Sequence, residues 1–111
     1  MISLQIVPRH GVDAYRLLRD KVTHEARTWA WKNRKRTRLT HKSDPKRGHI
    51  DVARADGVVV AEIRPVRPDD DWFFVEKFIG RIVAWFSSDI AAINVQFHDA
   101  TSPPSRTNRR K

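Results

Sequence analysis

The sequence contains no cysteine, which excludes disulfide bonds and thiolate metal sites. It also has no apolar run long enough to cross a membrane, and residues 2–7 are too few for the apolar region of a signal peptide. We therefore expect a cytoplasmic protein that does not contact membranes.

Glycine is scarce as well, since the chain has four glycines and one of them, Gly57, lies in a predicted turn. This leaves no glycine-rich phosphate loop, dinucleotide fingerprint or nucleophile elbow. The five histidines show neither HxH nor HExxH spacing, so we do not expect a zinc site. The sequence thus argues against a cofactor-dependent enzyme, and no cofactor is predicted.

Basic residues are abundant and concentrated in two segments. Residues 32–47 contain eight Lys or Arg and one acid, and they contribute +7 to a net charge of +9. Residues 103–111 contribute +4, which leaves −2 for the rest of the chain. Such a concentration is typical of nucleic-acid-binding proteins, because each phosphate contact releases condensed counterions.

We therefore predict a small protein that binds DNA or RNA through phosphate contacts, without catalysis. The predicted contact residues are Trp31, Lys32, Arg34, Lys35, Arg36, Arg38, Lys42, Lys46, Arg47, Arg109, Arg110 and Lys111.

Two tryptophans, Trp29 and Trp31, precede the basic segment. On a helix, residues two apart point about 200° away from each other, so one of the two indoles can be buried while the other is exposed. Trp29 continues an apolar stripe and is expected in the core. Trp31 is expected on the basic flank, where it either stacks on an unpaired base or covers a sheet edge.

Apolar spacing predicts the order of elements along the chain. Alternation predicts a short strand over residues 2–7, and helical spacing predicts a helix from about 12 to about 33. A weak strand follows at 36–42, and Asp56-Gly57 predicts a tight hairpin turn between strands 49–55 and 58–64. A second helix is expected over about 70–87, and a last strand over 90–97.

These elements indicate an α+β fold in the order βαβββαβ. We expect one small domain over residues 1–98, with a mainly antiparallel sheet, a central β-hairpin and two packed helices. Residues 99–111 are rich in Ser, Pro and Arg and are expected to form a disordered basic tail.

The predicted hairpin turn places Asp51 directly opposite Glu62. Two facing carboxylates destabilise a sheet unless a cation relieves them. Arg64, with a neighbour such as Arg38, can supply that charge through surface ion pairs. A bound divalent metal is the alternative, and the sequence leaves both open.

The order Asp51, ten intervening residues and then Glu62-x-Arg64, within an αβββαβ arrangement, resembles the PD-(D/E)xK nuclease family over about half of the chain. Ile50 stands where that family has proline, and Arg64 stands where it has lysine. The resemblance implies that Asp51 and Glu62 hold Mg²⁺, that Arg64 completes the catalytic site, and that the protein cleaves nucleic acid. A magnesium-dependent nuclease is therefore the first alternative function.

The second predicted helix carries apolar residues around much of its circumference, with Phe74 and Trp85 away from its main stripe. Surface of this kind is either covered by the core or used as an interface. A second alternative is thus a small regulatory or inhibitory interaction module, or a homodimer formed through residues 72–86.

Overall fold

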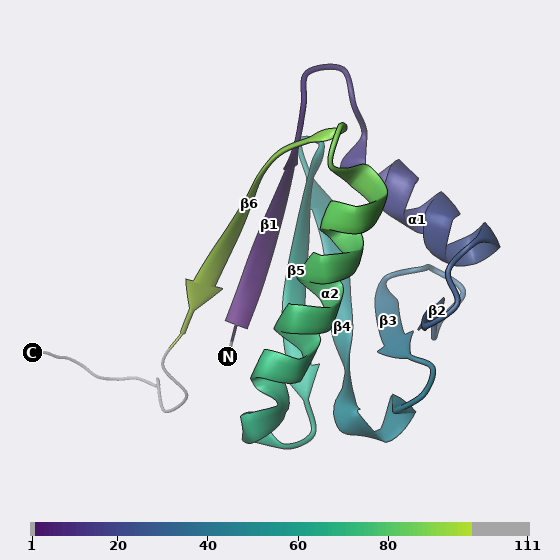
Figure 1. Cartoon of the computed structure of the whole chain (residues 1–111), viewed down its shortest axis with the longest axis vertical. Helices are drawn as coiled ribbons and strands as arrows, with labels where there is room; N and C mark the ends of the chain where they lie inside the picture. The colour runs from purple at the N-terminus through teal and green to yellow at the C-terminus, as the bar shows by residue number, and fades with distance from the viewer. Residues whose placement is uncertain (1, 99–111) are drawn as a thin grey trace, which may run out of the picture.

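The structure, a computed structural model, describes residues 2–98. Six antiparallel strands form one sheet in the order β2-β3-β4-β5-β1-β6, and both helices lie on the same face of it (Figure 1). The elements are β1 (Ile2–Pro8), α1 (Ala14–His24), β2 (Trp29–Trp31), β3 (Arg38–His41), β4 (Gly48–Ala55), β5 (Val58–Pro65), α2 (Asp71–Phe86) and β6 (Ile90–Phe97), with short 3₁₀ turns at Pro45–Arg47 and Pro68–Asp70. The predicted α+β class is confirmed, with one strand more than expected.

The strands follow the alternation of their sequences. In β1, Ile2, Leu4 and Ile6 are buried beneath the helices, whereas Gln5 points to the opposite face. The central hairpin has the predicted register, with Asp51 opposite Glu62. Asp56 and Gly57 adopt φ values of 51° and 82°, as a two-residue type I′ turn requires.

The first helix is shorter than predicted. Asp13 caps α1 by accepting a hydrogen bond from the Arg16 amide, and the helix ends at His24 rather than near residue 33. The Ala26 amide closes this end by donating to the Lys21 carbonyl, five residues back. The predicted helix was wrong beyond this point because its last apolar residues also fit a strand.

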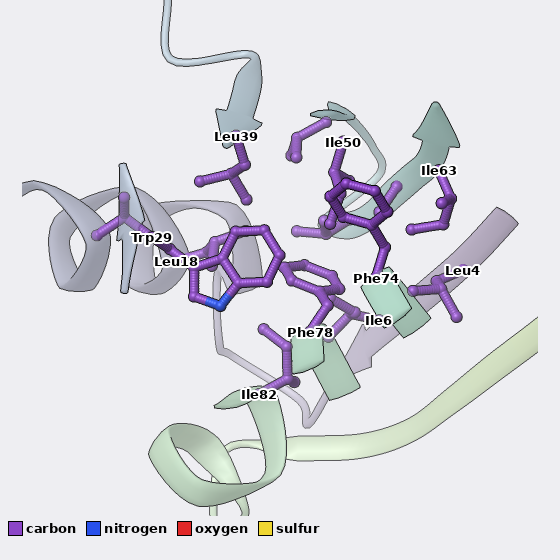
Figure 2. Close-up of a cluster of buried hydrophobic side chains, with 14 of the residues drawn as sticks. Leu4, Ile6, Leu18, Trp29, Leu39, Ile50, Ile63, Phe74, Phe78 and Ile82 are labelled. Carbon is purple, nitrogen blue, oxygen red and sulfur yellow. The ribbon is translucent and has the colours of Figure 1, made fainter. Parts of the chain in front are cut away.

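Those residues form β2, which pairs with β3 and places Trp29 opposite His41. Alternate residues of a strand share a face, so both Trp29 and Trp31 point toward the helices. Trp29 is 1% exposed, and its ring lies 5.8 Å from Phe78 and 6.5 Å from Phe74. Figure 2 shows this indole among side chains from the sheet and both helices.

The second helix matches its predicted range closely. Its sheet-facing residues are Phe73, Phe74, Phe78, Ile82 and Phe86. Phe74 is completely buried, so it belongs to the core rather than to an exposed surface. Trp72, near the start of the helix, is 59% exposed. Within residues 2–98, neither helix combines the length and the apolar character needed to span a bilayer.

Candidate nucleic-acid interface

The first part of the basic segment, residues 32–47, includes a tight loop between β2 and β3. We call this loop, residues 33–37, the basic turn. The side chain of Asn33 holds it together. Its Oδ1 accepts hydrogen bonds from the amides of Thr37 (3.0 Å) and Arg38 (3.2 Å), and its Nδ2 donates to Thr37 Oγ1 (2.7 Å). These bonds give the loop a defined shape independent of any partner.

A tyrosine on α1 attaches the basic turn to the body of the protein. The Tyr15 hydroxyl donates to the Arg36 carbonyl at 2.9 Å. The Arg54 guanidinium lies over the Tyr15 ring, 4.8 Å from its centre. Arg36 has a φ of 55°, a conformation that non-glycine residues adopt at a cost, so tertiary contacts must maintain it.

The cations of this region point into solvent. Lys32, Arg34, Lys35 and Arg36 are all exposed. Within residues 2–98, none of these four side chains takes part in an ion pair. Their positive field is therefore unopposed by nearby acids of the described chain.

A second basic group lies beyond the other end of β3. Lys42 and Lys46 are exposed, and neither forms an ion pair with another residue of the described range. At a rise of about 3.3 Å per residue along β3, Lys42 lies at most about 20 Å from Arg36, which is in the turn before the strand. The segment predicted as one basic surface is thus divided into two groups.

Three predicted contact residues also contact other side chains or carbonyls of the protein itself. Arg38 Nε lies 3.1 Å from Asp51 Oδ1. Arg47 pairs with Asp44 and Asp70 and stacks 3.9 Å from the centre of the Phe73 ring. The sequence analysis anticipated the Arg38–Asp51 pair, whereas the approach of Asp70 to Arg47 depends on where α2 begins and has no sequence signal.

Trp31 is the third of these residues. It is partly buried, its Nε1 donates to the Arg19 carbonyl at 3.3 Å, and its ring lies 6.5 Å from that of Tyr15. Of the two expected positions, Trp31 takes the one in which its ring packs against the protein, here against α1. Stacking on a base stays a prediction. The other three predicted contacts, Arg109, Arg110 and Lys111, lie outside the described residues.

The facing carboxylates of β4 and β5 form a second charged cluster, on the helix-free face of the sheet. We call Asp51, Glu62, Arg38 and Arg64 the carboxylate patch. Arg64 bridges both acids, with Nε 3.4 Å from Asp51 Oδ2 and Nη2 3.0 Å from Glu62 Oε1. The expected arginine pairing is therefore present.

His49 borders the carboxylate patch, with Nε2 3.3 Å from Asp51 Oδ1. Burial, and then the nearby positive charge of Arg38, lower the pKa of His49 despite that carboxylate.

These contacts also bear on the nuclease alternative. Glu25, which follows the last residue of α1, lies on the helix-covered face of the sheet, away from Asp51 and Glu62. Among residues 2–98, no three histidine or acidic side chains converge in a way that could hold a metal ion. Cleavage by Asp51, Glu62 and Arg64 remains a prediction that the geometry does not test.

Sequence reasoning missed four residues beside the basic groups. Tyr15 and Arg54 support the basic turn, and Arg27 and Arg81 lie near Lys42. No local pattern marks them, because Arg54 and Arg81 come from elements distant in sequence. Arg27 precedes Trp29 and was assigned to a helix that ends before it.

No family model, curated protein or solved structure matches the chain. The chemistry of the site is therefore inferred from its own residues.

Proposed function

We propose that this protein binds nucleic acid without catalysis, using the basic turn and the neighbouring Lys42 and Lys46 to contact phosphates. The observation that carries the proposal is the exposed series Arg34, Lys35 and Arg36, which forms no ion pair within residues 2–98, on a loop held by Asn33 and Tyr15. Exposed cations on a preformed loop bind a polyanion with little ordering cost.

The proposed contacts position the partner rather than read its sequence. Arginine and lysine bind phosphate oxygens in any sequence context, whereas base recognition requires side chains directed at base edges. A separation of at most about 20 Å between the two basic groups allows the protein to contact several successive phosphates. We therefore expect salt-sensitive binding with weak sequence preference.

Charge reversal at the basic turn tests this proposal. The triple variant Arg34→Glu, Lys35→Glu and Arg36→Glu should lose affinity for labelled DNA and RNA oligonucleotides at moderate salt, measured by fluorescence anisotropy. The matched control reverses Arg9, Arg67 and Lys77, which are exposed elsewhere on the molecule. Both variants change the net charge equally, so equal losses in the two would contradict a localised site.

Self-association through α2 is a second candidate, supported by exposed apolar residues on one flank of that helix. Trp72 and Val83 are 59% and 50% exposed, and Val75 and Ile79 on the same flank are only partly buried. The opposite flank faces the loop after α1, so this flank lies toward β1 and β6 (Figure 1). At the end of β6, Phe97 is 76% exposed.

Sedimentation equilibrium over a range of protein concentrations tests this second candidate. We expect dimer formation in the wild-type protein and a monomer in Val83→Lys. A monomeric wild-type protein at all concentrations would reject it. Lys77→Ala, on the solvent side of α2, is the control and should leave the mass unchanged.

A further inference from the structure

A hollow of 350 Å³ lies between the loop that follows α1 and the last turns of α2. Four consecutive residues, 25–28, form one wall, and Arg81 and Trp85 form the other. Small-molecule sites typically measure about 300–1,000 Å³, so this hollow has room for one small ligand.

The charge of the hollow favours an anion. Arg27 and Arg81 are exposed, and no ion pair within residues 2–98 engages either of them. Glu25 is the one acid among the lining residues, and Lys21 Nζ contacts its Oε1 at 3.1 Å. Two guanidinium groups therefore remain available to phosphate oxygens.

The indole of Trp85 gives the same hollow an aromatic surface. Trp85 is partly buried, and its ring meets that of Phe86 edge to face at 5.9 Å, with 69° between the planes. This contact orients the indole against the helix. An aromatic ring beside two arginines matches a nucleotide, because the base stacks on the ring while the arginines bind flanking phosphates.

The hollow adjoins the proposed phosphate-binding surface. The Lys42 amide donates to the carbonyl of Thr28, one of the lining residues, at 2.7 Å. The backbone of Lys42 therefore lies next to the wall of the hollow that Thr28 forms. The two sites are close enough to act on one ligand.

We infer that this hollow receives one unpaired nucleotide, with its base on Trp85 and its phosphates at Arg27 and Arg81. The inference deepens the proposed function and rests on it, because it names single-stranded nucleic acid as the preferred partner. In a duplex, both faces of each internal base are covered by its neighbours, so an indole has no free face to stack on. A duplex would bind through the basic turn, Lys42 and Lys46 without placing a base in the hollow.

Fluorine NMR of protein labelled with 5-fluorotryptophan tests this inference. The four tryptophans give four signals, and Trp85→Phe identifies the signal of Trp85. A single-stranded oligothymidine should shift the Trp85 signal and leave that of buried Trp29 in place, whereas a blunt duplex should shift neither. A Trp85 signal unmoved by saturating oligothymidine would overturn the inference.

Affinity measurements on matched variants separate this inference from the proposed function. Trp85→Ala should weaken oligothymidine binding about 5- to 150-fold and leave duplex affinity unchanged. Trp72→Ala, the same change at an exposed position on the other flank of α2, should affect neither. If the basic-turn reversal abolishes binding but Trp85→Ala has no effect, the inference fails and the proposed function stands. If Trp85→Ala weakens binding but the reversal does not, the proposed function fails.

Discussion

The carboxylate patch lies on strands β3, β4 and β5, and the basic turn is the loop that leads into β3. Both contain two arginines, but only those of the patch pair with acids of the described chain. In the patch, Arg38 and Arg64 each contact a carboxylate of the same sheet. In the basic turn, Arg34 and Arg36 contact no acid of the described chain. The fold thus supplies acidic partners for the arginines of the patch. It supplies none, within residues 2–98, for the arginines of the basic turn.

This difference shows that charge density along a sequence does not by itself define a binding surface. Arg36 and Arg38 are two residues apart, but the register of β3 places Arg38 opposite Asp51, and Arg36 lies in the loop. The three-dimensional pairing decides which cations keep an unopposed field. The substitutions at Asn33, at Asp51 and Glu62, and at Arg36 described below each alter one side of this comparison.

The largest expected effect comes from removing the side chain that shapes the basic turn. Asn33→Ala deletes three hydrogen bonds, two of them to backbone amides. We expect the free energy of unfolding in urea to fall by about 1–2 kcal/mol. Affinity for nucleic acid should fall as well, because the turn must then be ordered on binding.

Asn94→Ala is the control for Asn33→Ala. The Asn94 side chain makes one exposed contact, to Gln5 Oε1 at 3.4 Å. We expect its loss to change the unfolding free energy by less than about 0.5 kcal/mol. Equal effects of the two substitutions would mean that Asn33 does not organise the turn.

A smaller effect should follow from converting the carboxylate patch into a second basic surface. The double variant Asp51→Asn and Glu62→Gln leaves Arg38 and Arg64 without acidic partners in the patch. We expect affinity for nucleic acid at low salt to rise on the order of tenfold, and the gain to disappear at high salt. Fluorescence-anisotropy titrations at low and at high salt measure the gain in affinity and its disappearance.

The same double variant tests the nuclease alternative. If Asp51 and Glu62 hold Mg²⁺, the wild-type protein cuts DNA or RNA when magnesium is added, and the variant binds without cutting. Gel assays of both proteins with varied substrates distinguish the outcomes. Absence of magnesium-stimulated cutting by the wild-type protein would reject the nuclease alternative.

A substitution at Arg36 should separate stability from binding. Arg36→Gly removes the Cβ that disfavours a φ of 55°, so the free energy of unfolding should stay equal or rise by up to about 1 kcal/mol. Affinity should fall, because one phosphate contact is lost. Arg36→Lys keeps the charge and the backbone cost, and should retain most of the affinity with no gain in stability.

The smallest effect concerns a group that the fold keeps uncharged. His41 is buried between the rings of Trp29 and Phe73, and burial lowers its pKa below the ordinary value of 6.5. As the pH falls below 6.5, His41 therefore takes up a proton more readily in the unfolded chain than in the folded one. The stability that the protein has above pH 6.5 is lost as the pH falls through the pKa of His41 in the folded state. Urea midpoints should be lower at pH 5.5 than at pH 7.5, and His41→Gln should reduce the difference. An undiminished difference in that variant would show that His41 does not cause it.

The sequence predicted those parts of the fold that depend on local pattern. The alternation of β1, the Asp56-Gly57 turn and the register that pairs Asp51 with Glu62 are confirmed by the structure. The end of α1 was not predictable from apolar spacing, because Trp29 fits both a helical and a strand period. Pairing with β3 decides the outcome, and that pairing is a tertiary event.

The candidate site was predictable only in part for the same reason. The exposed cations of the basic turn follow from sequence composition. Their distinction from Arg38 and Arg47 requires knowledge of Asp51 and Asp70, which the fold brings near. The hollow beside Trp85 combines residues more than 50 positions apart, and no sequence pattern joins them.

The salt dependence of nucleic-acid affinity tests the central claim most directly. Affinity falls as salt rises, so the slope of log affinity against log salt is negative. If the side chains of Arg34, Lys35 and Arg36 contact phosphates, reversing all three should reduce the magnitude of this slope by about 2–3. Reversal of Arg9, Arg67 and Lys77 should leave that slope nearly unchanged. An equal change in slope for both triple variants would contradict the account, because the positive charge would then act from the whole surface.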